Sequence, residues 1–146
     1  MLRVEVNQRG KKLELLNERK LTERLQQLSE KLLWPSESDY PWETIALENV
    51  DDLEAKLLAI IDSPAETKIE IQELDRFFSR VTEEKDWYNE EEIAQCKGYQ
   101  NLVAFLKNHL KDIKVYRVGE IEVNCYILGK TESGAIAGLF TMSVET

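Results

Sequence analysis

The sequence predicts an α+β fold in which helices cover an antiparallel sheet. In the last third of the 146-residue chain, three strand-like segments follow one another with short connections, at 113–118, 121–128 and 135–144. Strands connected in this way form an antiparallel meander. Two long segments with helical spacing, 17–33 and 89–110, precede the meander. They must bury their apolar faces against the sheet, so a layered α+β domain is expected.

The first helix is predicted from leucines at helical spacing. The series is Leu21, Leu25, Leu28 and Leu32. Asn17 is a candidate N-cap. The helix is expected to end near Leu33–Trp34, because the residue before Pro35 avoids the helical region. The residues before the helix, 1–12, are expected to form a poorly ordered leader.

The second helix has a stronger start signal. Asn89 fits the N-cap position, and Glu92 stands where it would complete a capping box. The helix is predicted to run to about Leu110. Its apolar stripe is Cys96, Tyr99, Val103, Leu106 and Leu110.

Shorter elements lie between the two helices. Residues 44–48 are predicted to form a short strand, 51–61 a helix, 67–71 a strand and 74–80 a single helical turn. No linker or internal repeat interrupts the pattern. Residues 1–146 are therefore predicted to form a single domain.

The strand at 121–128 alternates, and one of its faces is predicted to be apolar throughout. That face carries Ile121, Val123, Cys125 and Ile127. The cysteines, Cys96 and Cys125, both fall on apolar faces, and two cysteines make no disulfide framework. They are expected to be reduced thiols inside the core.

The charge distribution excludes some classes of partner. The net charge is −9, yet residues 1–31 carry eight basic and five acidic residues, so the acidic excess lies in the rest of the chain. Such a field repels nucleic acid and anionic membranes, so neither is expected as a partner, and it attracts basic proteins. Neither a membrane-spanning stretch nor a secretory signal is visible, which predicts a cytoplasmic protein.

The sequence contains no recognisable catalytic or metal-binding motif. His109 is the only histidine, and the cysteines are too far apart for a CxxC site. No phosphate-binding glycine motif or nucleophile elbow appears. We therefore predict no enzyme activity, no cofactor and no metal in the free protein. A hydrolase that uses two of the 28 acidic residues stays open, because counting acids has little specificity.

Three features favour binding as the function. A polar, acidic loop between Pro35 and Pro41 is flanked by tryptophans. A second acidic loop, 81–88, contains adjacent Trp and Tyr residues, which commonly anchor interfaces. Trp87 could alternatively fold back onto the core. The third feature is Thr146, which follows the last strand closely and offers a hydroxyl and a carboxylate.

Residues in these three places resemble the nuclease A inhibitor family. The first stretch is Leu-Leu-Trp-Pro-Ser-Glu-Ser-Asp-Tyr-Pro-Trp-Glu at 32–43. The second is Phe-Phe-Ser-Arg at 77–80, followed by Asp-Trp-Tyr at 86–88. The third covers Val-Tyr-Arg-Val-Gly-Glu at 115–120 and the terminal Val-Glu-Thr. Residues 48–68 show no such resemblance.

The resemblance implies a fold, a partner and a set of site residues. The fold would be a three-layer α/β/α sandwich around a mostly antiparallel meander sheet. The partner would be a sugar-non-specific, metal-dependent DNA/RNA endonuclease of the ββα-metal type. Glu37 would stand in for the scissile phosphate, the Thr146 hydroxyl would coordinate the nuclease's catalytic Mg²⁺, and Asp86 and Trp87 would form a separate contact.

Within the first loop, Ser36, Ser38 and Tyr40 are expected to hold the Glu37 carboxylate in place. The alternative function is an acidic regulatory interaction module that binds a different basic protein. Inhibition of a nuclease would distinguish the two.

Overall fold

The chain forms the α+β fold that the sequence predicts. A computed structural model describes residues 9–48, 52–61, 63–64 and 66–145, with side chains from residue 19 onward. In chain order the elements are α1 (Arg9–Ser29), β1 (Leu33–Trp34), β2 (Tyr40–Pro41), β3 (Glu43–Leu47), α2 (Leu53–Ile60), β4 (Ile69–Gln72), α3 (Leu74–Thr82), α4 (Glu90–His109), β5 (Lys111–Val118), β6 (Glu122–Lys130) and β7 (Ile136–Val144).

The main sheet has five strands in the order β3-β7-β6-β5-β4, and every neighbouring pair is antiparallel. The predicted C-terminal meander is confirmed as β5, β6 and β7. Gly119 makes the tight turn between β5 and β6 with φ +114, a value that strains residues with a Cβ. β1 and β2 form a separate two-stranded hairpin.

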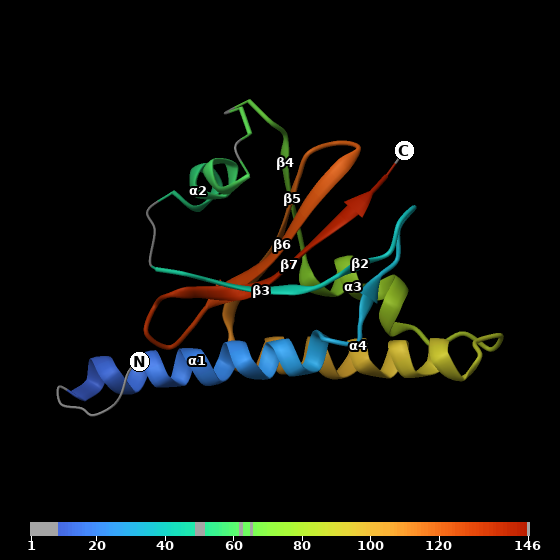
Figure 1. Cartoon of the computed structure of the whole chain (residues 1–146), viewed down its shortest axis with the longest axis horizontal. Helices are drawn as coiled ribbons and strands as arrows, with labels where there is room; N and C mark the ends of the chain where they lie inside the picture. The colour runs from blue at the N-terminus through green and yellow to red at the C-terminus, as the bar shows by residue number, and fades with distance from the viewer. Residues whose placement is uncertain (1–8, 49–51, 62, 65, 146) are drawn as a thin grey trace.

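Helices cover both faces of the main sheet, which gives the three-layer sandwich (Figure 1). α1, α3 and α4 lie on one face and α2 lies on the other. Alternate residues of β6 feed the two cores: Val123 and Ile127 join the cluster under the three helices, while Tyr126 and Leu128 join the cluster under α2. Because both faces are covered, the central strand is apolar on both sides.

The first helix differs from its prediction at both ends. α1 begins at Arg9, so Asn17 lies inside the helix and is not its N-cap. Residues 9–12, expected in a leader, belong to this helix, while residues 1–8 lie outside the described part. α1 ends at Ser29, whose hydroxyl donates to the carbonyl of Leu25 (2.8 Å) and satisfies part of the last turn. Leu32 is still buried, but it follows the helix.

Two further predictions need correction. The helical turn at 74–80 is a nine-residue helix that continues to Thr82, so the second loop begins at Glu83 and not at Val81. Continuing the helix buries Val81 beside Phe77 and Phe78 in the larger core. Ile121, expected on the apolar face of β6, precedes that strand and is 61% exposed, because it belongs to the turn.

The fourth helix matches its prediction closely. Asn89 accepts a hydrogen bond from the backbone of Glu92, and the Glu92 carboxylate accepts one from the backbone of Asn89, which completes the capping box. All five residues of the predicted stripe are buried. Leu102, which the stripe omitted, is also buried. This rigid helix is the support for both loops described next.

Candidate interaction surface

The first loop (residues 35–39) is the tip of the β1–β2 hairpin. The segments on its two sides carry Trp34 and Trp42, which are 1% and 7% exposed and anchor the loop in the core. Trp34 stacks on Phe77 of α3 with ring centroids 4.4 Å apart. Large apolar rings on both sides of a short polar tip fix the direction in which the tip leaves the core.

Tyr99 of α4 joins the two sides of the first loop. Its hydroxyl donates to the carbonyl of Leu33 (2.6 Å) and accepts a hydrogen bond from the Trp42 indole (2.8 Å). Burial raises the pKa of Tyr99, so its proton stays on the oxygen at physiological pH. Gln95, one turn earlier, accepts from the Leu33 backbone (3.2 Å) and donates to Lys31 (2.7 Å). The loop base is thus fixed to a long helix.

The tip of the first loop is also joined to the end of β7. The backbone amide of Glu37 donates to the carbonyl of Val144 (3.2 Å), and the amide of Val144 donates to the Ser36 hydroxyl (3.1 Å). The Ser36 hydroxyl in turn donates to the carbonyl of Ser38. The Glu37 side chain is exposed. Glu37 therefore projects into solvent beside the last strand.

Tyr40 pairs with Trp34 in the hairpin and is half-buried. The carbonyl of Pro41 accepts a hydrogen bond from the Thr141 hydroxyl of β7 (2.7 Å). The hairpin is therefore held to β7 at its base as well as at its tip.

The last described residue, Glu145, is held in place by several groups. Its carboxylate accepts from Arg117 of β5 (2.6 Å) and from Ser143 (2.9 Å), and its amide donates to Ile121 (2.8 Å). The Arg117 guanidinium holds the pKa of the Glu145 carboxyl below its ordinary value. Thr146 lies outside the described residues. The residue before it is nevertheless fixed next to the Val144 contact with the first loop.

Arg80 links the first loop to α3. Its guanidinium donates to the carbonyl of Pro35 (2.6 Å) and lies 4.4 Å from the centre of the Trp34 ring. Cation–π contacts of this kind favour one geometry of the arginine over the ring. Because α3 leads directly into the second loop, Arg80 connects the two loops through one short helix.

The second loop (residues 83–89) exposes its tryptophan. Trp87 is 76% exposed, so the alternative in which it folds back onto the core is wrong. Asp86 is also exposed. The loop ends are fixed, since Gln100 of α4 donates to the carbonyl of Thr82 (2.9 Å) and Asn89 caps α4. An apolar ring left in water on a fixed loop is typical of an interface anchor.

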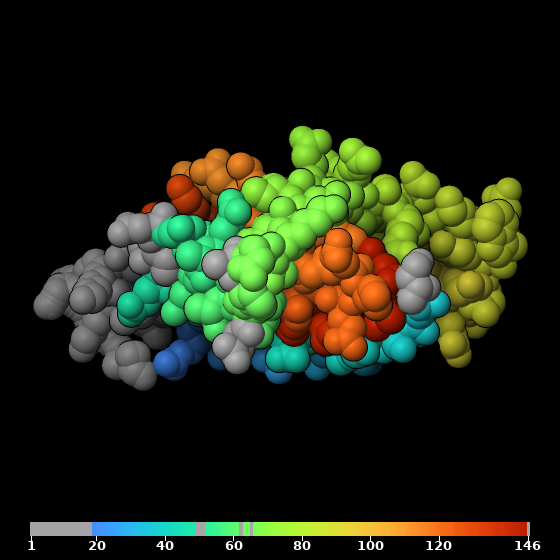
Figure 2. Space-filling view, turned by 90° about the horizontal axis from the view of Figure 1, so that it is seen from above, coloured from blue at the N-terminus to red at the C-terminus, as the bar shows by residue number. Residues whose placement is uncertain are grey.

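The two loops and the end of β7 lie at the same end of the molecule (Figure 1). From above, the cyan first loop lies next to the red end of β7, and the olive second loop lies beyond it (Figure 2). Along α4, Gln95 is six residues after the cap Asn89, a rise of about 9 Å, so one helix spaces the two loops. The Glu37 backbone bonds to Val144, the residue before Glu145, while Asp86 and Trp87 form a separate region.

The cysteines and the histidine of the described part pack against other side chains. The described residues contain no group of three or more His, Cys, Asp or Glu residues that could hold a metal ion. Cys96 and Cys125 are free and buried, and burial raises the pKa of Cys125 to about 12, so its thiolate is absent at neutral pH. The His109 ring packs on Phe105 of its own helix, with centroids 4.2 Å apart.

Sequence reasoning missed three supporting residues, Tyr99, Arg80 and Arg117. Tyr99 was identified only as part of an apolar stripe, and its hydroxyl has no sequence signal. Arg117 lies opposite Glu70 in the register of β4 and β5, and their side chains are 3.2 Å apart. That pairing is a usable signal only once the strand register is known.

Comparison with known proteins gives the family. The sequence model of the nuclease A inhibitor-like proteins matches residues 19–146, and so includes residues 48–68, where the sequence pattern alone showed no resemblance. No curated protein sequence matches the chain significantly. In the described residues, no helix is both long and apolar enough to cross a membrane. Matched over most of its length, the chain belongs to the nuclease A inhibitor-like family.

Proposed function

We propose that this protein inhibits a sugar-non-specific, metal-dependent DNA/RNA endonuclease of the ββα-metal type by occupying its active site. Membership of the nuclease A inhibitor-like family supports a nuclease-inhibitor role in general. The observation that carries the finer proposal is the pair of hydrogen bonds between the first loop and Val144. They join the backbone of Glu37 and the hydroxyl of Ser36 to Val144, and this supports the proposal that Glu37 and Thr146 act together.

In this proposal Glu37 supplies the negative charge that the scissile phosphate would otherwise bring. A nuclease cleft is positive because it binds a polyanion, so an exposed carboxylate on a fixed loop is attracted to it. The backbone bond from Glu37 to Val144 and the Ser36 hydroxyl restrict the loop before binding. A loop ordered in advance loses less conformational entropy on association.

Thr146 would act on the metal of the nuclease. Mg²⁺ prefers hard oxygen ligands, and a threonine hydroxyl is one. Glu145, fixed by Arg117 and Ser143, would deliver that hydroxyl beside Glu37. The metal belongs to the nuclease, and this chain would contribute one ligand to it.

Asp86 and Trp87 would form a second contact away from the metal. Burial of an exposed tryptophan at an interface is typically worth about 2 kcal/mol or more. The acidic field of the chain, with net charge −9, would speed the encounter with a basic nuclease. A cytoplasmic location, where the inhibitor would protect the producing cell from its own nuclease, is part of the same proposal.

The direct test is titration of such a nuclease with the purified protein, with cleavage of duplex DNA as the readout. We expect activity to fall linearly and to vanish near equal concentrations. Raising the salt from about 0.1 M to about 1 M should slow association, because it screens the charges. Tight binding to a different basic protein without any loss of nuclease activity would instead favour the acidic regulatory module.

A further inference from the structure

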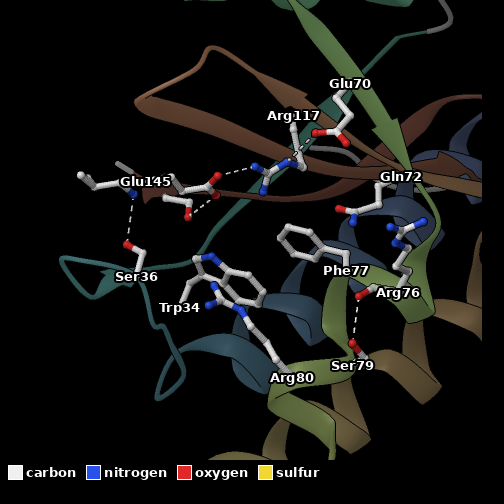
Figure 3. Close-up of a pocket in the computed structure, with 12 residues that line it drawn as sticks. Trp34, Ser36, Glu70, Gln72, Arg76, Phe77, Ser79, Arg80, Arg117 and Glu145 are labelled. Atoms are coloured by element: carbon white, nitrogen blue, oxygen red, sulfur yellow. Dashed lines mark hydrogen bonds and ion pairs between the residues drawn. The ribbon is translucent and has the colours of Figure 1, made fainter.

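We propose that a pocket beside the first loop binds a phosphate group, either orthophosphate or the terminal phosphate of a nucleotide. The pocket has a volume of about 390 Å³ and lies between β4, α3 and the end of β7 (Figure 3). Its walls include Trp34, Gln72, Arg76, Arg80, Arg117 and Glu145. The family match does not assign it, and the argument for it does not depend on the proposed inhibition.

The pocket gathers positive charge in a chain of net charge −9. Arg117 is neutralised by Glu70 and Glu145, at 3.2 and 2.6 Å. Arg76 and Arg80 make no ion pair with any carboxylate in the described part of the chain. Two guanidiniums one helical turn apart, both on the pocket side of α3, form a site for an anion.

Two polar atoms in the pocket wall lack partners. Among the described residues, the buried side-chain atoms without a hydrogen bond are Trp34 Nε1 and Gln72 Oε1, and both residues line this pocket. Trp34 is 1% exposed. A native protein rarely leaves a buried donor unsatisfied, and such an atom has an ordered water, an ion or a ligand as its usual partner. Both atoms are covered in the free chain, so side chains of the pocket wall must shift as the ligand enters.

Phosphate fits this combination better than a carboxylate does. At neutral pH orthophosphate carries both hydrogen-bond acceptors and an O–H donor, and the terminal phosphate of a nucleotide carries that donor in its singly protonated fraction. Its charged oxygens are acceptors of the kind that the two arginines and Trp34 Nε1 lack, and its O–H is a donor of the kind that Gln72 Oε1 lacks. An ionised carboxylate has no donor for Gln72. The volume falls in the range of small-molecule sites, about 300–1,000 Å³, so a nucleotide phosphate has room as well as the free ion.

The test is a two-dimensional ¹H–¹⁵N spectrum of the indole N–H groups during titration with orthophosphate or adenosine monophosphate. Substitution of each tryptophan by phenylalanine assigns the three signals. We expect the Trp34 signal to move saturably. The position of the Trp42 signal should not change, because its indole already donates to Tyr99. The position of the signal from the exposed Trp87 should not change either. Adenosine and sodium chloride at equal ionic strength are the controls.

The matched variants are Arg76→Gln and Arg19→Gln. Arg76 lies on the pocket and Arg19 lies on α1 outside it, so the two changes remove the same charge from different places. Loss of one charged hydrogen-bonding partner should weaken phosphate binding about tenfold in Arg76→Gln. Arg19→Gln should bind as the unsubstituted protein does. The proposal would be overturned by the absence of saturable movement of the Trp34 signal, by an unchanged phosphate affinity in Arg76→Gln, or by equal movement in sodium chloride, whatever the nuclease assay shows.

Discussion

At the scale of single residues, the exposed and the buried tryptophans have different roles. Trp34 and Trp42 are buried under the first loop and hold its base. Trp87 is 76% exposed in the second loop, so its ring contributes little to folding and is free to contact a partner. A ring exposed to this extent is available as an interface anchor.

Trp87→Ala should therefore separate binding from stability. We expect affinity for the nuclease to fall by about 2 kcal/mol, roughly thirtyfold, while the urea midpoint of the free protein stays unchanged. Calorimetric titration and urea denaturation measure the two quantities. Ile60→Ala, which truncates a 45%-exposed residue on α2, is the matched control and should change neither. A large loss of stability in Trp87→Ala would show that the ring supports the fold instead.

The ion pair between Arg117 and Glu145 should make the chain end sensitive to acid. The pKa of Glu145 is held below its ordinary value of 4.5, chiefly by the hydrogen bond from Arg117. A lowered folded-state pKa stabilises the protein above the ordinary value, and this contribution is lost as the pH falls through the lowered value.

The matching variant is Glu145→Gln, compared with the unsubstituted protein by urea denaturation from about pH 7 to about pH 3. The variant should have a lower free energy of unfolding near neutrality. This difference from the unsubstituted protein should disappear as the pH drops below the ordinary pKa of the glutamate. Because the Glu145 carboxylate is 37% exposed, solvent screens its ion pair with Arg117, and the difference in stability should be small. A difference that is constant with pH would contradict a role for the charged form.

At the scale of elements, local sequence signals predict the ends of some helices well and the ends of others poorly. The capping box at Asn89 and the helical stripe of α4 are local, so they predicted that helix closely. The start of α1 lacks such a signal, and a plausible cap at Asn17 turned out to lie within the helix. α3 extends two residues past its predicted end because burial of Val81 in the core favours the helical conformation there, which is a tertiary effect.

The candidate site could be predicted only in part. Proline, tryptophan and acidic residues marked both loops, and the family resemblance named Glu37, Asp86, Trp87 and Thr146. The contacts that hold the first loop come from residues far away in sequence, such as Ser36 with Val144 and Trp42 with Tyr99. No local pattern reports such pairings, because they depend on how β7 and α4 pack against the hairpin.

Tyr99→Phe tests the bond between α4 and the hairpin. The substitution keeps the ring but leaves the Trp42 indole and the Leu33 carbonyl without their partner. Loss of one partner of a buried hydrogen bond should destabilise the protein by about 1–3 kcal/mol in urea denaturation. Tyr88→Phe, in the second loop, is the control and should change stability by less than about 0.5 kcal/mol. Equal effects of the two substitutions would show that the hydroxyl bridge adds nothing.

At the scale of the whole molecule, the sandwich presents its functional candidates at one end. The first loop, the second loop and the end of β7 share that end, whereas the turn between β6 and β7 lies at the other (Figure 1). α4 and the main sheet connect the two ends and support the loops. Loops fixed in this way can enter a cleft without rearrangement, so association need not order the chain first.

A tag of about ten residues added after Thr146 should abolish most inhibition while leaving the fold intact. The added chain would displace the terminal hydroxyl and carboxylate from the cleft. A tag of equal length at the N-terminus is the control, and it should leave inhibition unchanged. Circular dichroism checks the fold, and the nuclease titration measures inhibition. Full inhibition by the C-terminally tagged protein would exclude contact between Thr146 and the metal of the nuclease.

The central claim is that Glu37, presented beside the end of β7, occupies the phosphate position of a nuclease active site. Its most direct test is the inhibition constant of Glu37→Ala against a sugar-non-specific ββα-metal endonuclease. Glu132→Ala, an exposed glutamate in the turn at the opposite end, serves as the matched control. The account predicts that Glu37→Ala inhibits at least about tenfold more weakly, with Glu132→Ala and the stability of both variants unchanged. Equal inhibition by Glu37→Ala and the unsubstituted protein would contradict it.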